Sequence, residues 1–291
     1  MFIAGIDGGG THTRIELRDM ENRLLRRGEF GPFNLNAIGE SAFRRLLREV
    51  FAWCGDMAGC DRLCVGAAGI SNPKVGEILS EELALSGFQG KWKLCGDQEI
   101  ALRGAMDGEG LVLVAGTGSI CFGKNAAGAT ARSGGYGHLI DDGGSGYALG
   151  RDVLACAVRC TDGRVRDSGI LQAVCRRLGG GPERIIPFVY GPATDKAAIA
   201  GFSAIALDQA EKGDPEALRI LRQEARELVV LVRAVQQTLG LAGCRIALLG
   251  GLLENDNLYR QLVSGELSSC GAVNAPAHSA LWGAAQMAWE L

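Results

Sequence analysis

Several features that mark membrane or nucleic-acid-binding proteins are missing from this sequence of 291 residues. It has no stretch of about 18 or more apolar residues, so no membrane-spanning helix is expected. It has no run of about five basic residues and a formal net charge of −3, so neither nucleic acid nor an anionic membrane is expected as a partner. The chain enters its first strand at Phe2 without a charged leader, which predicts a cytoplasmic protein.

Metal-ligating patterns are also missing. The ten cysteines include no CxxC pair, and the three histidines are scattered along the chain. Most cysteines lie inside apolar runs, as Cys64 does in LCVGAAG and Cys121 does in SICFG. A free cysteine is commonly a small buried hydrophobic residue, and thiols inside cells stay reduced. Disulfides, zinc and iron–sulfur clusters are therefore not expected.

Glycine is abundant, with 44 residues, and the opening stretch FIAGIDGGGTHTRIELR (residues 2–18) shows its use. An apolar strand ends there at Asp7, and three glycines follow. Glycine tolerates positive φ and lets backbone N–H groups approach an anion, so DGGGT predicts a hairpin turn around phosphate. The alternation of Ile15 and Leu17 with charged residues predicts a return strand, whereas the Walker loop and the dinucleotide fingerprint both open a helix. A plain glycine-rich hairpin is the alternative.

A second stretch repeats this plan. Residues 111–124, LVLVAGTGSICFGK, contain a strand, a GTGS turn and another strand. Two Gly/Thr hairpins, each starting a block of strands and helices, predict two similar halves. The chain length also suits about two domains. A cleft between such halves could hold a nucleotide, with one hairpin contacting phosphate from either side.

Hydrophobic periodicity predicts the other elements. Strands are expected at 23–30, 62–69, 93–97 and 245–251, and helices at 40–53, 77–87, 98–106, 150–178, 199–212 and 278–291. Asp214 as N-cap and Pro215 at the first helical position begin another long, buried helix, which ends at Gly240. The last helix carries small residues on one side, which suits close packing.

Three further places hold candidate site residues. Residues 132–151 are too rich in glycine for regular structure, yet they include two adjacent carboxylates, and polar loops often carry function. A solvated turn is the alternative reading of this segment. The double glycine at 250–251 either lets a flat ligand approach the backbone or makes a tight turn. Asp97, between a strand and a helix, is either a catalytic carboxylate or an ordinary helix cap.

In their joint order, these motifs resemble the sugar kinase, heat-shock ATPase and actin superfamily, and within it the BadF/BadG/BcrA/BcrD-type ATPases and N-acetylglucosamine kinases. The motifs are DGGGT at 7, GPFN at 31, GD at 96, GTGS at 116, GGYGH at 134, DDGGSGY at 141, AGF at 200, GDP at 213 and LGGLLEN at 249. The resemblance covers nearly the whole chain. It implies an α/β protein with two ribonuclease H-like, actin-like ATPase domains that flank a nucleotide cleft. Residues 1–108 and 109–275 would form the two domains, with the hinge near 107–110, and residues 276–291 would return to the first as a helix.

The same resemblance implies a role for each matching residue. The ATP phosphates would be held by Gly8, Gly9, Gly10, Thr11, Gly116, Thr117 and Gly118, the adenosine part by Ala200, Gly250, Gly251 and Asn255, and the sugar by Asn34, Asp97, Ser119, Gly135, Tyr136, Gly137 and Asp142. Asp7 would hold Mg²⁺. Asp97 would be the catalytic base, kept ionised by the start of its helix. The implied activity is an ATP-dependent amino-sugar kinase that acts on the 6-hydroxyl of N-acetylglucosamine, and a homodimer is expected.

Other activities of the same fold stay open. These are a glucosamine or muramic-sugar kinase, a sugar sensor without catalysis, and an ATPase that activates a dehydratase or reductase. The last would need a cysteine in a glycine-rich context at a dimer axis, and no cysteine here is set that way. The family loop usually reads Gly-Asp-Glu-Gly-Ser, but residues 141–145 here read Asp-Asp-Gly-Gly-Ser. The extra carboxylate of Asp141 keeps glucosamine open as the acceptor, because an added carboxylate near the 2-position would favour a free amine over an N-acetyl group.

Overall fold

The computed structural model describes residues 1–70, 72–106, 108–166 and 168–291. Contacts within this part of the chain divide it into two compact units. The first unit joins Met1–Gly108 to Pro276–Leu291, and the second is Glu109–Ala275. Residue 107 of the expected hinge lies outside the described residues. Each unit has its own sheet and its own hydrophobic core.

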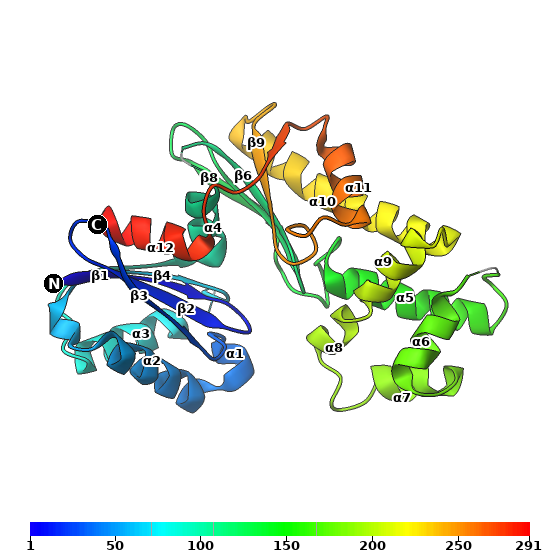
Figure 1. Cartoon of the computed structure of the whole chain (residues 1–291), viewed down its shortest axis with the longest axis horizontal. Coiled ribbons are helices and arrows are strands. Elements are labelled where there is room, and N and C mark those ends of the chain that lie inside the picture. The colour runs from blue at the N-terminus through cyan, green and yellow to red at the C-terminus, as the bar shows by residue number, and fades with distance from the viewer. Residues whose placement is uncertain (71, 107, 167) are drawn as a thin grey trace. The chain divides into compact units, whose positions relative to one another are not determined.

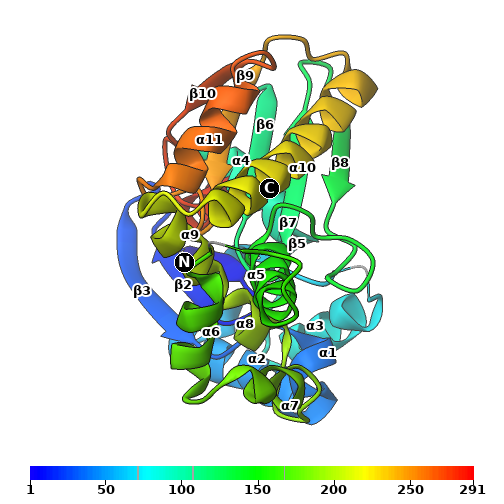
Figure 2. The same ribbon diagram turned by 90° about the vertical axis from the view of Figure 1, so that its right-hand side faces the viewer.

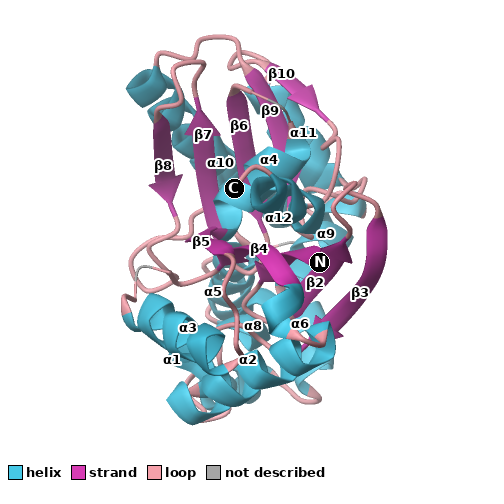
Figure 3. Ribbon diagram, turned by 90° about the vertical axis from the view of Figure 1, so that its left-hand side faces the viewer, coloured by secondary structure: helices cyan, strands magenta, loops and turns pink. Residues whose placement is uncertain are grey.

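The first unit is built on a five-stranded sheet in the order β3-β2-β1-β4-β5. Its strands are β1 (Phe2–Gly8), β2 (Thr13–Arg18), β3 (Leu24–Phe30), β4 (Cys60–Ala67) and β5 (Lys91–Gly96). β1, β2 and β3 pair antiparallel, whereas β4 runs parallel to β1 and β5 runs parallel to β4 (Figure 3). The carboxyl ends of β1, β4 and β5 therefore share one edge of the sheet, where Asp7 and Asp97 are found.

Helices cover both faces of this sheet (Figure 1). One face carries α1 (Leu35–Ile38), α2 (Glu40–Cys54), the 3₁₀ turn Met57–Gly59 and α3 (Lys74–Leu85), and the other carries α4 (Asp97–Ala105) and α12 (Ala280–Trp289). Residues at helical spacing on α2, such as Phe43, Leu47 and Val50, are fully buried. α12 packs closely on β1, because a Cβ placed on Gly5 would lie 2.4 Å from the backbone nitrogen of Ala285. The predicted close packing of the last helix is confirmed.

The second unit repeats the strand arrangement of the first. Its strands are β6 (Gly110–Ala115), β7 (Ser119–Lys124), β8 (Thr130–Gly134), β9 (Arg245–Leu249) and β10 (Ala272–Asn274). They follow the order β10-β9-β6-β7-β8, in which β6, β7 and β8 pair antiparallel, β9 runs parallel to β6, and β10 runs parallel to β9. Each strand thus has a counterpart in the first sheet, and the prediction of two similar halves is confirmed.

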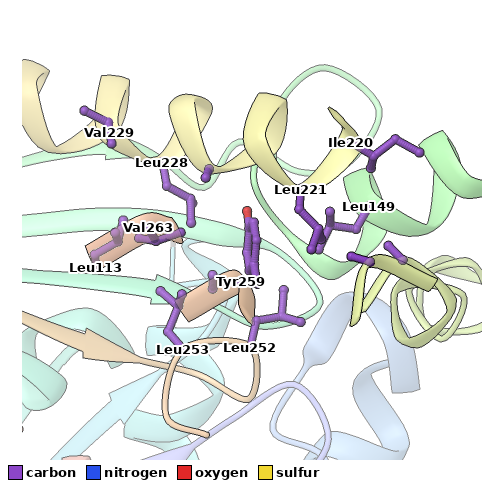
Figure 4. Packing of buried hydrophobic residues seen from close by; sticks show 14 of the residues in the cluster. Leu113, Leu149, Ile220, Leu221, Leu228, Val229, Leu252, Leu253, Tyr259 and Val263 are labelled. Carbon is purple, nitrogen blue, oxygen red and sulfur yellow. The ribbon is translucent and has the colours of Figure 1, made fainter. Parts of the chain in front are cut away.

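The helices of the second unit include one long helix that lies over β7 and β8 (Figure 2). They are α5 (Gly146–Thr161), α6 (Ile170–Leu178), α7 (Ile185–Val189), α8 (Lys196–Ala200), α9 (Ser203–Glu211), α10 (Pro215–Leu239) and α11 (Leu258–Leu267), with a 3₁₀ turn at Pro182–Arg184. α10 begins as predicted, because the side chain of Asp214 accepts hydrogen bonds from two backbone N–H groups of its first turn. Its apolar face, including Leu221 and Leu228, packs around the ring of Tyr259 (Figure 4).

Expectations for the middle of the chain are partly wrong. The glycine-rich segment 132–151 is not irregular throughout, because β8 extends to Gly134 and α5 begins at Gly146. The helices expected at 150–178 and 199–212 are each two helices, α5 with α6 and α8 with α9. Packing explains one of the glycines, since a Cβ on Gly150 would lie 2.0 Å from the carbonyl oxygen of Ile199 in α8. No helix in the described residues is long and apolar enough to span a bilayer.

Candidate functional site

The first glycine turn joins β1 to β2 as an antiparallel hairpin, as predicted. The backbone N–H of Gly9 closes the turn by donating to the carbonyl oxygen of His12 at 2.9 Å. A Cβ on Gly8 would lie 2.7 Å from the ring of Phe33, whereas no atom lies within 4 Å of one placed on Gly10. Packing therefore requires glycine at position 8. The exposed tip at positions 10 and 11 is free to meet a ligand.

Two carboxylates stand at the adjoining edge of the first sheet. Asp97 is the first residue of α4, and its Oδ1 accepts a hydrogen bond from the backbone N–H of Gln98 at 2.9 Å. Burial raises the pKa of Asp7 to about 6, and the nearby charge of Asp97 adds to the effect, while Arg14 opposes it. Burial also raises the pKa of Asp97, so burial outweighs the helix start that was expected to keep this side chain ionised. Such a pair favours a bound cation or a shared proton.

The pair suits magnesium better than a metal enclosed by protein ligands. Among the described residues, no group of three or more His, Cys, Asp or Glu side chains could hold a metal ion. Mg²⁺ usually takes one or two carboxylates and completes its shell with water and substrate phosphates. Asp7, with Asp97 beside it, fits an ion of that kind bound together with a nucleotide.

The GTGS turn joins β6 to β7 and rests on the first turn of α5. The N–H of Gly116 donates to the carbonyl oxygen of Gly118 at 2.9 Å and closes the hairpin. The carbonyl oxygens of Gly116 and Thr117 accept hydrogen bonds from the N–H groups of Gly146 and Tyr147, at 2.8 and 3.3 Å. Thr117 is exposed at the tip. The hairpin is therefore held firmly while its threonine remains accessible.

Asp142 lies behind this hairpin, buried and in the left-handed region with φ +66°. Its Oδ1 accepts a hydrogen bond from the N–H of Ser119 at 3.2 Å, and its Oδ2 accepts one from Nζ of Lys196 at 2.7 Å. Sequence reasoning missed Lys196. The sequence signal for it is its place four residues before Ala200 of the AGF motif.

The peptide of Gly144, in the same loop, is gripped from two helices. Its N–H donates to Oε2 of Glu224 on α10 at 2.6 Å, and its carbonyl oxygen accepts from the hydroxyl of Tyr259 on α11 at 2.8 Å. Arg151 on α5 pairs with Asp152 at 2.8 Å and reaches Glu224 at 3.8 Å. Burial raises the pKa of Glu224 to about 7, against the opposing effects of the Gly144 hydrogen bond and Arg151. Neither Glu224 nor Tyr259 had a sequence signal.

The predicted sugar residues of segment 135–137 lie on an exposed turn. Gly135 and Gly137 have φ of +77° and +94°. The ring of Tyr136 is 63% exposed, with the guanidinium of Arg132 4.9 Å from its centroid. The N–H of Tyr136 donates to Oδ2 of Asp141 at 3.1 Å. The carboxylate that was expected to select a free amine therefore also closes this turn.

Asn34 and Asp97 are the two predicted sugar residues that belong to the first unit. Asn34 caps α1, and its side-chain oxygen accepts a hydrogen bond from the N–H of Ala37 at 3.2 Å. The other predicted sugar residues, Ser119, 135–137 and Asp142, belong to the second unit.

The predicted adenosine residues all belong to the second unit. Gly250 follows β9 with φ +88°, and a Cβ there would lie 2.5 Å from the carbonyl oxygen of Ala115 at the end of β6. The side-chain nitrogen of Asn255 donates to the carbonyl oxygen of Gly251 at 2.9 Å. Ala200 ends α8 and is buried beside the start of α5. These turns therefore adjoin the base of the GTGS hairpin.

This chain is similar to known proteins over most of its length. The profile of the BadF/BadG/BcrA/BcrD ATPase family matches residues 4–288. The N-acetylmuramic acid/N-acetylglucosamine kinase of Clostridium acetobutylicum is 32% identical over 268 residues, which are 88% of this chain and 87% of that protein. The N-acetyl-D-glucosamine kinase of Dictyostelium discoideum is 28% identical over 91% of this chain and 89% of its own. The crystal structure of a proposed N-acetylglucosamine kinase from Chromobacterium violaceum matches 98% of both chains, with a TM-score of 0.83 and 25% identity.

Proposed function

The chain belongs to the BadF/BadG/BcrA/BcrD ATPase family, and on that premise we propose that it is an ATP-dependent kinase of amino sugars, acting on the 6-hydroxyl of N-acetylglucosamine. ATP use follows from the family. The sugar is supported by the relatives from Clostridium acetobutylicum and Dictyostelium discoideum, which are both named kinases of N-acetylglucosamine and span most of this chain.

The pair Asp7 and Asp97 is the observation that carries the proposal. Kinase chemistry asks for a carboxylate near the acceptor and a cation near the phosphates, and this edge of the first sheet has one carboxylate for each role, Asp97 as the base and Asp7 to hold the cation. In the proposed reaction, the sugar oxygen forms a bond to the γ-phosphorus of ATP while the bond from that phosphorus to the β,γ-bridging oxygen breaks. ADP leaves with the electron pair, and the hydroxyl proton passes to Asp97. The raised pKa of Asp97 makes it a better proton acceptor.

The phosphates would contact the two hairpins. Gly10 and Thr11 offer an exposed tip in the first unit, and Thr117 offers one in the second. We propose that Asp7 holds Mg²⁺, which neutralises phosphate charge when bound. Ala200, Gly250, Gly251 and Asn255 would receive the adenosine part. The sugar would bind to Asn34, Asp97, Ser119, Gly135, Tyr136, Gly137 and Asp142.

N-acetylmuramic acid is a second candidate acceptor, because the relative from Clostridium acetobutylicum is named for both sugars. Glucosamine stays a prediction that rests on Asp141. Since this carboxylate also receives the N–H of Tyr136, an amine would have to share it. The homodimer and the cytoplasmic location stay predictions from the sequence, and sedimentation analysis tests the former.

Formation of ADP across a panel of sugars tests the proposed function. The panel contains N-acetylglucosamine, glucosamine, N-acetylmuramic acid, glucose and a control without sugar, all with ATP and Mg²⁺. We expect ADP only in the presence of sugar, fastest with N-acetylglucosamine, and a phosphate ester at its 6-position by NMR. Equal ADP formation in every tube, including the control, would refute the kinase.

A further inference from the structure

Lys196 places a positive charge against the GTGS hairpin. Its Nζ lies 2.7 Å from Oδ2 of Asp142. A Cβ placed on Gly118 would lie 2.9 Å from the same Nζ and 2.9 Å from Oδ1 of Asp142. The space that a side chain at position 118 would need is therefore filled by an ammonium and a carboxylate, which lie beside the hairpin at Gly118.

The surroundings of this ion pair leave the lysine partly free. Asp142 is 2% exposed and uses its other oxygen for the N–H of Ser119, so it is anchored on two sides. The side chain of Lys196 is 30% exposed. An ammonium has three N–H donors, and the hydrogen bond to Asp142 uses one of them. The remaining donors are available to an anion at the hairpin.

We propose that Lys196 binds the phosphate chain of ATP at the GTGS hairpin and that Asp142 holds its ammonium in place. This inference rests on the proposed kinase function and adds a residue to it. Phosphoryl transfer depends on positive charge that meets the phosphate oxygens, and a lysine serves as such a point charge. Thr117 then supplies a hydroxyl and Lys196 the charge at the same hairpin. In this role, the carboxylate of Asp142 acts through Lys196, whose ammonium it positions.

A different role would give different measurements. If Lys196 only neutralised the buried Asp142, its loss would disturb Asp142 and the sugar, and would affect all nucleotides equally. If Lys196 binds phosphate, its loss should lower the affinity for a nucleotide more, the more phosphates that nucleotide carries.

The test measures binding of AMP, ADP and ATP to Lys196→Met by calorimetry, with Mg²⁺ and without sugar. We expect ATP to bind about 10- to 100-fold more weakly than to the unmodified protein. The affinity for ADP should fall by a smaller factor, and the affinity for AMP should change by less than about twofold. Lys196→Arg should recover most of the ATP affinity. Lys212→Met is the matched control, because Lys212 forms an exposed pair with Asp208 on α9, and it should change none of the three affinities.

Removing one partner of a buried pair can itself unfold a protein. The double variant Asp142→Asn, Lys196→Met removes both charges and is compared with Asp142→Asn alone, so the graded loss can be read even if the single lysine variant does not fold. An equal loss for all three nucleotides, or a raised KM for sugar with unchanged nucleotide affinities, would overturn the inference. These titrations contain no sugar. A graded loss of nucleotide affinity in a protein that phosphorylates no sugar would therefore refute the kinase activity alone and leave the inference about Lys196 standing.

Discussion

Asp97 shows how two local effects compete at one residue. A helix start favours a negative charge, but burial disfavours it, and burial decides the direction because the pKa of Asp97 is raised. Asp7 has the same tendency and is further affected by the charge of Asp97. A carboxylate in this state accepts a proton more readily than one in water, which suits a general base.

We expect Asp97→Asn to lower kcat for sugar phosphorylation by about 10²- to 10⁴-fold, since an amide accepts no proton. The affinity for ATP measured by calorimetry should change little, because the hairpin tips are untouched. Asp19→Asn is a control in the same unit, in the turn after β2, where the carboxylate pairs with Arg23. Unchanged turnover in the Asp97 variant would remove it from the proposed role.

Gly116 and Gly118 flank the same threonine but differ in what surrounds them. No atom lies within 4 Å of a Cβ on Gly116, whereas one on Gly118 would overlap Asp142 and Lys196. We expect Gly118→Ala to lower the free energy of unfolding by about 1–3 kcal/mol, because the buried ion pair must move. Gly116→Ala should change it by less than about 0.5 kcal/mol. Urea unfolding measures both, and equal effects would contradict the packing described here.

At the scale of elements, α10 and α11 position a loop that neither contains. Glu224 of α10 and Tyr259 of α11 hold the two ends of one peptide group at Gly144. Because Gly144 lies in the segment that also contains Asp142 and the N-cap of α5, this grip sets the start of that helix and the position of the ion pair. Two helices from the core thus fix a loop that is distant from both of them in the sequence.

Glu224 makes the stability of the fold depend on pH. Its pKa is about 7 in the folded protein against an ordinary value of 4.5, so the folded state holds the proton more tightly than the unfolded chain. The stabilisation is fully present below about pH 4.5 and is lost as the pH rises through about 7. A pKa shift of this size corresponds to about 3 kcal/mol in the free energy of unfolding. The groups that interact with it are Asp152 and Arg151 on α5 and Tyr259 on α11.

We expect the free energy of unfolding of the unmodified protein to fall, relative to that of Glu224→Gln, between pH 4.5 and pH 8. Urea unfolding at a series of pH values measures this difference. Glutamine keeps an oxygen for the N–H of Gly144, so the grip on the loop survives in the variant. Glu227→Gln, exposed on the same helix, controls for the loss of a carboxylate. Parallel curves for Glu224→Gln and the unmodified protein would refute the role of Glu224.

At the scale of the whole molecule, the first unit is completed by the end of the chain. α12 lies on β1 and α4, where Ala284 and Ala288 are fully buried against Cys64 and Ile100. Glycines make this approach possible, since a Cβ on Gly283 would lie 2.1 Å from the carbonyl oxygen of Ile100. The last residues of the chain therefore supply, together with α4, the cover of one face of the first sheet.

We expect removal of residues 276–291 to destabilise the first unit far more than the second. The deletion exposes the apolar face of β1 and β4 to water, and burial of such surface is the main stabilising contribution to a fold. Hydrogen exchange followed by mass spectrometry should show lost protection in β1, β4 and β5, with protection retained in β6, β7 and β9. Equal protection of both sheets in the shortened chain would contradict this division of the chain.

Local patterns in the sequence determined a large part of this protein. The two Gly/Thr hairpins, the long helix from its Asp214 cap to Gly240 and the small-residue face of the last helix all follow from the identities of neighbouring residues, because turns, caps and helical periodicity involve positions only a few residues apart. The repeat of the hairpin also predicted two similar halves, and the structure shows that their sheets share one strand order.

Only the tertiary structure decided what surrounds the candidate site. Lys196 meets Asp142 across 54 residues of chain, Glu224 meets Gly144 across 80 and Tyr259 meets it across 115. The direction of the pKa shift of Asp97 likewise depends on burial by residues distant in the sequence. No hydrophobic periodicity or short motif in the sequence predicts such contacts. They arise only once separate helices and strands pack and exclude water from the groups between them.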